Sequence, residues 1–285
     1  MKVERVSGDT YARIADGDSI YDGWGANQGF VTTKEGAVVV DTGFTAGAAR
    51  ALIDEVKKKS PAPARLVVNT HDHSDHVFGN SLFDELSPII MAHANCRSRL
   101  IEMGKERMNG YRRFDPRLKS ALKGLRICPP RLTFQEEMDF MLGEKRIRLL
   151  HPRKTAHTTG DTMVFLPDER VLFAGDVLWV RYHPNLEDAD IEGWLSALEG
   201  ISKMRVDYIV PGHGPVTDKT SIAPLARYIR DFDAVFSKLV RDGLSKERIV
   251  EELVMEGTEE WLLSMIVERN VGVLYERYRK RIKEA

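Results

Sequence analysis

The sequence predicts a mixed α/β fold in which β-rich segments alternate with helices and a helical extension closes the chain. The chain has 285 residues, of which 42% are hydrophobic, and a formal net charge of −1. These values are typical of a globular protein with a substantial core, and they exclude disordered and fibrous proteins. Short β-type runs dominate up to residue 217, whereas the apolar spacing turns helical from residue 218 onward. We therefore expect one α/β domain over residues 1–217 with a helical extension over residues 218–285 packed on it.

The first part of the chain predicts a hairpin, a helix and a buried strand. Residues 29–40 contain two β-type runs joined by a Lys-Glu-Gly turn. Residues 46–58 have apolar positions on one helical face, and Thr45 is placed to cap this helix. The β-branched run at residues 66–69 then predicts a buried strand.

The later segments repeat this pattern of strands that end in turns. Residues 89–91 indicate a strand, and residues 137–150 indicate a hairpin that turns at a glycine. A further strand pair is expected within residues 162–174. A helix over residues 191–204 then leads to a strand at residues 208–210.

The composition also limits the surroundings in which the protein works. We expect a cytoplasmic protein without membrane contact, because no apolar segment approaches the ~20 residues that cross a bilayer and the start of the chain does not resemble a signal peptide. Cys96 and Cys128 are too few for a disulfide framework, and we expect buried reduced thiols. The near-zero net charge argues against a surface built wholly for nucleic acid.

A dense group of metal-ligating residue types follows the strand at residues 66–69. Three histidines and two aspartates occur between His71 and His76. Alternate residues of an extended chain point the same way, so His71 and His73 can reach one metal ion. Asp75 and His76 lie two to three positions later, where a helix can begin, and they are displaced toward a neighbouring point. Two adjacent metal positions are therefore expected.

Further candidate ligands lie in turns of small residues after later strands. They are His157 in Ala-His-Thr-Thr-Gly-Asp, Asp176 in Phe-Ala-Gly-Asp and His213 in Pro-Gly-His-Gly. Imidazole suits zinc, iron and similar ions, and a carboxylate can bridge two metals. The mixture fits a binuclear hydrolytic centre.

The order HxHxDH, AHTTGD, FAGD and PGHG resembles that of the metallo-β-lactamase superfamily of metal-dependent hydrolases, over roughly residues 28–216. The resemblance implies a four-layer αββα sandwich with the metals at one edge between two sheets. It also implies two metal sets and a bridging ligand: His71, His73 and His157 for the first metal, Asp75, His76 and His213 for the second, and Asp176 between them.

Three departures narrow the resemblance. Asp176 stands where true β-lactamases of the superfamily usually have Cys or Ser, so the chain is more similar to the glyoxalase II-like and broad hydrolase branches. His73 stands where flavodiiron relatives usually have Glu. Trp179 replaces the Tyr that follows the bridging aspartate in quorum-quenching lactonases.

We therefore expect a binuclear metal-dependent hydrolase acting on an ester, thioester, lactone or similar small molecule. The expected cofactors are two divalent ions, with zinc first and iron or manganese as alternatives. Two such ions, Asp75, Asp176 and a bridging hydroxide leave a residual charge of about +1, which favours an oxyanion and fits attack by that hydroxide. Asp75 is the expected catalytic residue that helps to orient the hydroxide.

Two other functions remain open. Some relatives with this type of site are oxygenases with one iron, which makes an iron-dependent oxygenase one alternative. The other is a phosphodiesterase or nuclease that uses residues 97–131, where eleven Lys or Arg face three acidic residues. This segment is either a solvated helical face or a cationic lid that attracts anionic substrates. Nucleic acid is weakly signalled, since only Tyr111 and Phe114 are aromatic there.

Several residues carry two interpretations. Asp41 is either a turn residue or a carboxylate that orients a histidine ligand. Asp72 is expected to be a polar surface residue or a helix cap. Three aromatic residues line either the pocket mouth or the core: Trp24, Phe30 and Trp179. His151 and His183 are expected to be structural, with contact to the substrate as the alternative, and His93 has no expected role.

The C-terminal extension is expected to bury one apolar helix face. The four residues with suitable spacing are Trp261, Leu262, Met265 and Ile266. This face would pack either on the catalytic domain or across a homodimer.

Overall fold

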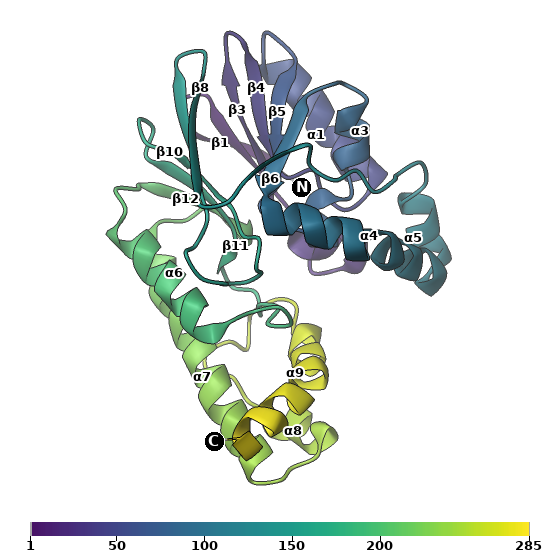
Figure 1. The fold of residues 1–285 in the computed structure, drawn as a ribbon, viewed down its shortest axis with the longest axis vertical. Helices are drawn as coiled ribbons and strands as arrows, with labels where there is room; N and C mark the ends of the chain where they lie inside the picture. Colours follow the sequence, from purple (N-terminus) through teal and green to yellow (C-terminus); the bar gives the residue numbers. More distant parts are fainter. Residues whose placement is uncertain (1, 285) are drawn as a thin grey trace.

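The computed structural model describes residues 2–284 and consists of helices, a sheet, a second sheet and further helices in four layers (Figure 1). This arrangement confirms the expected mixed α/β sandwich with a helical C-terminal region.

The first sheet has seven strands that follow one another in chain order. Neighbours from β1 to β4 are antiparallel, and those from β4 to β7 are parallel. The strands are β1 (Lys2–Ser7), β2 (Thr10–Ile14), β3 (Gln28–Thr33), β4 (Gly36–Val40), β5 (Ala64–Val68), β6 (Ile89–His93) and β7 (Leu132–Phe134).

The second sheet has five strands in the order β12-β11-β10-β9-β8. Only the pair β11 and β12 is parallel. The strands are β8 (Glu137–Leu142), β9 (Lys145–Leu150), β10 (Met163–Leu166), β11 (Val171–Trp179) and β12 (Tyr208–His213).

The helices lie outside the two sheets. Those that follow strands of the first sheet are α1 (Ala46–Lys59), α2 (Ser74–Val77), α3 (Asn80–Asp84), α4 (Ala94–Phe114) and α5 (Pro116–Ala121). Those that follow strands of the second sheet are α6 (Ile191–Lys203), α7 (Ile222–Arg241), α8 (Lys246–Glu252) and α9 (Met265–Glu284). The 3-10 turns are η1 (Ile20–Gly25) and η2 (Lys219–Ser221).

Apolar residues fill each space between layers. Val38, Val68, Ile147 and Val164 belong to the cluster between the sheets. On the outer face of the first sheet, other strand residues pack against Leu52 and its neighbours on α1. Strands such as β4 are buried along their whole length because both faces are covered, which explains their continuous apolar sequence.

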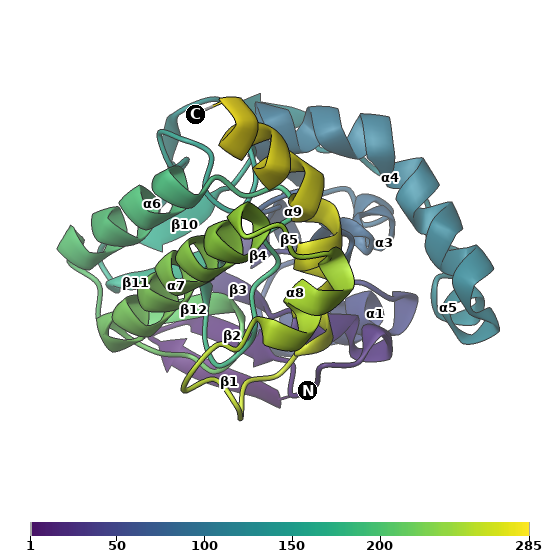
Figure 2. The same cartoon turned by 90° about the horizontal axis from the view of Figure 1, so that it is seen from below.

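The C-terminal helices share a core with the second sheet. Figure 2 shows α7 beside α6, with α9 close to α7. A single apolar cluster contains Leu172 of β11, Trp194 of α6, Phe232 of α7 and Leu274 of α9. The division at residues 217 and 218 stays a prediction.

The structure corrects the apolar face expected in the extension. Helix α9 begins only at Met265, so Trp261 and Leu262 precede it and the four residues do not share a helix face. Leu262 is 38% exposed and Met265 is 67% exposed. One apolar helix face made of these four residues is therefore wrong, although Trp261 and Ile266 do pack against the cluster of the second sheet. The possible homodimer stays a prediction.

No helix within residues 2–284 is both long and apolar enough to cross a membrane.

Candidate metal centre

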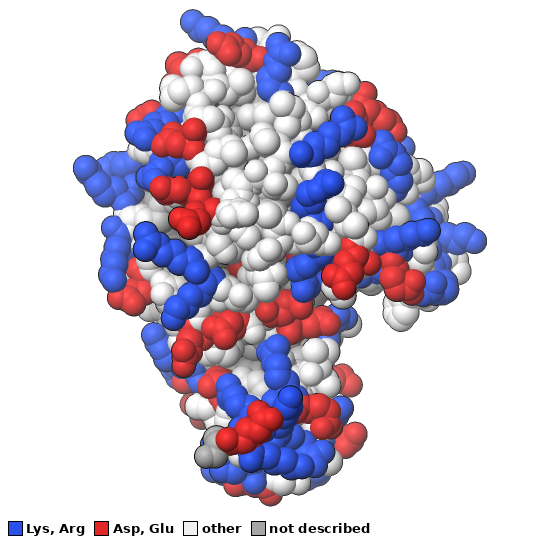
Figure 3. Space-filling model, viewed as in Figure 1, with Lys and Arg blue, Asp and Glu red and all other residues white. Residues whose placement is uncertain are grey.

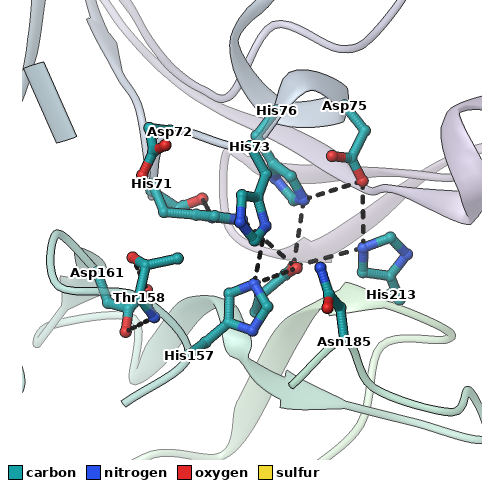
Figure 4. A network of polar contacts seen from close by, with 12 residues as sticks. His71, Asp72, His73, Asp75, His76, His157, Thr158, Asp161, Asn185 and His213 are labelled. Atoms are coloured by element: carbon teal, nitrogen blue, oxygen red, sulfur yellow. Dashed lines mark hydrogen bonds and ion pairs between the residues drawn. The ribbon is translucent and has the colours of Figure 1, made fainter. Parts of the chain in front are cut away.

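The fold brings the sequence motifs together at one edge of the two sheets (Figure 4). Strand β5 ends at Val68, and a loop with bends at Thr70 and Asp72 carries His71 and His73 before α2 begins at Ser74. The short α2 places Asp75 and His76 at a neighbouring point, as the sequence predicts, with the ring centres of His76 and His71 4.3 Å apart. The second sheet supplies its residues from the loop before β10, from β11 and from the end of β12: His157, Asp176 and His213.

The first group of side chains consists of His71, His73 and His157 around one oxygen of Asp176. Asp176 Oδ2 lies 3.5 Å from His71 Nε2 and 3.3 Å from His157 Nε2. His157 Nε2 lies 3.0 Å from His73 Nδ1. The four ligand atoms lie within 4.8 Å of one another, so they could hold one metal ion.

The second group consists of Asp75, His76 and His213, and it meets the other oxygen of Asp176. Asp176 Oδ1 lies 3.2 Å from His76 Nε2 and 3.5 Å from His213 Nε2. Asp75 Oδ2 lies 3.6 Å and 3.5 Å from the same two nitrogens. These side chains could hold a second metal ion, with Asp176 between the two groups.

The unpaired polar atoms of the centre support this interpretation. His71 Nε2, His76 Nε2, His213 Nε2 and Asp176 Oδ1 are buried without a hydrogen-bond partner in the described chain. Buried polar atoms without partners are rare because burial costs them their hydration. Their convergence on shared points fits metal ligation, for which imidazole and carboxylate are suitable donors.

Asp41 orients two of the histidines, which supports the second interpretation of this residue. His76 donates from Nδ1 to Asp41 Oδ2 over 2.8 Å, which leaves Nε2 free to face the centre. Thr70 donates its hydroxyl to the same oxygen and accepts a hydrogen bond from His71 Nδ1. Asp41 is thus a positioning residue of the kind that well-ordered metal sites require.

In His73 and His213 the ring nitrogen that points away from the centre also has a hydrogen-bond partner, whereas in His157 it has none in the described residues. His73 donates from Nε2 to Asp188 Oδ2 over 3.1 Å, and His213 donates from Nδ1 to the carbonyl oxygen of Trp24 over 2.9 Å. His157 Nδ1 is buried without a partner in the described residues. The tautomers of His73 and His213 therefore leave their other nitrogens free to bind metal.

Glycines allow the backbone to approach Asp176. A Cβ at Gly212 would lie 1.9 Å from Asp176 Oδ1. Gly175, at a φ of 53°, faces Thr70 so closely that a Cβ would lie 2.7 Å from its Cβ. The small residues of the Phe-Ala-Gly-Asp and Pro-Gly-His-Gly segments are thus required by close packing.

The electrostatics of the centre reflect its concentrated charge. Burial raises the pKa of Asp176, yet the surrounding histidines, led by His76 and His213, hold that pKa well below its usual value. Burial lowers the pKa of His157 well below its usual value. Asp176 is therefore ionised and can bind cations, and His157 is neutral, as a metal-ligating imidazole must be.

Asp72 is neither a polar surface residue nor a helix cap, contrary to the expectation from the sequence. Its side chain is fully buried and pairs with Arg99 Nε over 3.0 Å and with Arg107 Nη1 over 2.7 Å. Arg99 also pairs with Asp188, the partner of His73. Helix α4 thereby holds the loop of the metal centre from outside.

Asp188, Arg99 and Arg107 are therefore site residues that the sequence did not single out for this role. Asp188 lies 115 positions from His73, so no local spacing reveals the contact. Its only signal is an acidic residue in a loop that follows a strand carrying a candidate ligand. For the two arginines the only signal in the sequence is the basic segment at residues 97–131, which indicates a solvated helical face or a cationic lid rather than contacts with the metal centre.

A cavity of about 260 Å³ opens over the centre. Trp24 and Trp179 line it, whereas Phe30 lies in the core beside α1. The other walls combine apolar and charged residues from α4 and the C-terminal extension: Met103, Arg107, Tyr111, Leu263, Ile266 and Arg269.

The three other histidines have structural contacts. His93 stacks on His151 with ring centres 3.9 Å apart and accepts a hydrogen bond from Asn95 N. His183 bonds the hydroxyl of Tyr228 through Nδ1. None of the three lines the cavity over the metal centre.

The comparisons with known proteins agree with the fold and the motif order. A family model of the metallo-beta-lactamase superfamily matches residues 21–213, so the chain belongs to this superfamily. The chain is 24% identical over 259 residues to the linear primary-alkylsulfatase of a Pseudomonas species, a match that covers 78% of this chain and 49% of the relative. It thus spans about half the length of that relative.

Other relatives are enzymes that carry the name of the superfamily. The chain is 26% identical over 194 residues to the type 2 metallo-beta-lactamase of Bacillus cereus, covering 66% of this chain and 67% of that enzyme. The solved structure of a metallo-beta-lactamase from Pontibacter korlensis is similar with a TM-score of 0.64 and 21% identity, covering 80% of this chain and 98% of that one. This structural similarity shows the fold.

Proposed function

We propose that the protein is a hydrolase that holds two divalent metal ions, zinc first, and cleaves an ester, thioester, lactone or similar small molecule. The single observation that carries this proposal is Asp176, whose Oδ2 faces the first group of histidines and whose Oδ1 faces the second. The proposed ligands are the seven residues already described: His71, His73, Asp75, His76, His157, Asp176 and His213.

These seven residues would hold the two ions, which would supply hydroxide at neutral pH and stabilise the oxyanion of a hydrolytic transition state. Asp75 lines the cavity and is the proposed catalytic residue, because its carboxylate can accept a hydrogen bond from the attacking water and orient it. Trp179 stacks on His213 with ring centres 3.8 Å apart and donates from Nε1 to the carbonyl oxygen of Asp176. It therefore restrains two proposed ligands.

A sulfate ester is the second candidate substrate class. It is supported by the match to the alkylsulfatase, which covers 78% of this chain. The cavity also has Met103, Leu263 and Ile266 among its walls, which suits the apolar tail of such a substrate.

The basic segment gives less support to a nucleic-acid substrate. Six of its eleven basic residues already form ion pairs: Arg99, Arg107, Arg113, Arg117, Arg126 and Arg131. On the face shown in Figure 3, basic and acidic side chains are interspersed. These pairs favour the interpretation as a solvated helical face.

A substrate panel with metal-loaded protein tests the proposal. It contains nitrophenyl ester, thioester, lactone, phosphodiester, β-lactam and medium-chain alkyl sulfate substrates, with the Asp176→Ala variant as control. We expect turnover of at least one ester or sulfate ester by the parent and strong loss in the variant. One iron per chain with oxygen consumption and no hydrolysis would instead establish the oxygenase alternative.

A further inference from the structure

A second cavity, of about 200 Å³, lies beside the metal centre and shares Asp75 with the cavity above it. It is lined by Arg13 of β2, Gln28 of β3 and the first turn of α1. We propose that this second cavity binds a small oxyanion, a carboxylate, phosphate or sulfate group, through the guanidinium of Arg13.

Arg13 is a buried cation without a counter-charge. It is 6% exposed, and its one hydrogen-bond acceptor within residues 2–284 is Gln28 Oε1, on the strand residue paired with it. No carboxylate in this described part of the chain lies within ion-pair distance of its guanidinium. Buried arginines ordinarily have anionic partners, because removing the charge from water is costly. The remaining N–H groups of Arg13 are therefore available to an anion in the cavity that the residue lines.

The nearby end of α1 adds positive potential. Thr45 and Ala48 line the cavity, and they belong to the cap and first turn of this 14-residue helix. The N-terminus of a helix carries a partial positive charge that favours anions. The first turn of α1 contains no acidic residue that would neutralise it. Helix and guanidinium thus favour the same ligand charge.

The acidic groups around the cavity do not fill this role. Asp22 also lines the cavity, but its carboxylate lies against Gly17 and the residue is exposed. Asp75 is turned toward His76 and His213. Glu55 of α1 acts on Arg13 only at longer range, and burial still lowers the pKa of the guanidinium. The cavity between these groups is the place where an anion would meet Arg13.

The position beside Asp75 gives the oxyanion two possible sources. It can be a free anion from solution, or it can be an acidic group of the substrate or product at the metal centre. A guanidinium binds each of these oxyanions by the same charge-assisted hydrogen bonds. The second source, unlike the first, depends on the proposed hydrolase function.

Thermal melting of metal-loaded protein tests the site directly. Acetate, sulfate and phosphate are titrated separately against chloride at equal ionic strength. We expect a saturable rise in the Tm of the parent, because a ligand that binds only the folded state stabilises it. Arg13→Met should bind at least about tenfold more weakly, and in chloride it should melt no lower than the parent, because the desolvated charge is gone. Arg13→Gln is the second variant if Arg13→Met does not fold.

The control variant is Arg50→Met, which removes an exposed arginine of α1 that lines neither cavity and should keep the anion-dependent rise. Equal responses of parent and Arg13→Met, or no response of the parent, would overturn the proposal. A pair of nitrophenyl esters with and without a terminal carboxylate separates the two sources. A raised KM of Arg13→Met for the carboxylate ester alone assigns the site to the substrate, whereas equal effects of added acetate on both esters assign it to a free anion. Absence of hydrolysis with a retained melting response would refute the hydrolase function and leave the anion site.

Discussion

Asp41 adopts a backbone conformation that its side-chain contacts explain. Its φ is 59°, in the left-handed region that non-glycine residues seldom occupy. Such strain persists where the surroundings hold it, often at functional sites. The conformation directs one carboxylate at Thr70 and His76 together. Sequence alone left open whether this aspartate was a turn residue, because that contact joins positions 35 residues apart.

Asp188 provides the sharpest test of a positioning residue. In Asp188→Asn the carboxylate that fixes the tautomer of His73 is lost, so affinity for the first metal should fall by about 10–100-fold. Competition with a chelator measures this affinity. Glu187→Gln is the matched control, since Glu187 lines the same cavity and pairs with Arg269 rather than with a histidine. Equal metal affinity in Asp188→Asn and the parent would contradict the role.

Asp72 should matter for stability more than an ordinary ion pair does. Its buried carboxylate pairs with two arginines of α4, so Asp72→Ala should lower the free energy of unfolding by about 3–5 kcal/mol. Asp84 is the control, because it pairs with the exposed Arg126 and Arg131. Asp84→Ala should cost about 1 kcal/mol or less. Denaturant unfolding compares the two, and similar losses would refute the distinction.

At the scale of elements, strands and helices with a strong local pattern could be predicted. The hairpin of β3 and β4, helix α1 with its Thr45 cap, and helix α6 lie where the sequence indicates. The cap acts as expected, since Thr45 Oγ1 accepts a hydrogen bond from Ala48 N.

Other elements were not predicted from the sequence, or, like α4, were only one of two interpretations of a segment. Helix α4 is rich in charged residues, contains two glycines and buries only a narrow stripe of Cys96, Leu100, Gly104 and Met108. Strand β1 has no buried residue and no apolar alternation. Strand β7 has three residues, and its pairing with β6 fixes it. In each case tertiary contacts rather than local pattern determine the element.

Gly212, near the end of β12, should not tolerate the addition of a single methyl group. In Gly212→Ala the new Cβ would displace Asp176 Oδ1, so metal content should fall while the protein stays folded. Gly200→Ala is the control, because Gly200 lies exposed in α6 with open space around it. It should raise stability by about 0.5–1 kcal/mol. Metal analysis and circular dichroism of both variants check this, and full metal content in Gly212→Ala would contradict it.

At the scale of the whole molecule, the shared apolar cluster couples the extension to the second sheet. Phe232 of α7 is fully buried in this cluster, so Phe232→Ala should cost about 3–5 kcal/mol and shift one common unfolding transition. Val254→Ala, at a residue 65% exposed, should change stability by less than about 0.5 kcal/mol. Calorimetry that resolves a separate early transition for the extension would contradict this coupling.

The ligands of the candidate site could be predicted from the sequence, whereas the residues that position these ligands could not. Four motifs placed seven candidate ligands, and the structure brings all seven side chains together. They lie after β5, in the loop before β10, within β11 and at the end of β12, and these segments meet at one edge of the two sheets. The contacts of Asp188, Arg99 and Arg13 could not be predicted, because they depend on how loops and helices pack across long sequence separations.

Metal content per chain tests the central claim, two metal positions that share Asp176, most directly. Mass spectrometry should find two metals per chain in the parent and close to one in His213→Ala. In Asp176→Ala the metal content should be reduced at both positions. His213 contributes to the second group alone, whereas Asp176 faces both groups through different oxygens. A parent with two metals and an Asp176→Ala variant that keeps both and remains fully active would contradict the shared-ligand assignment.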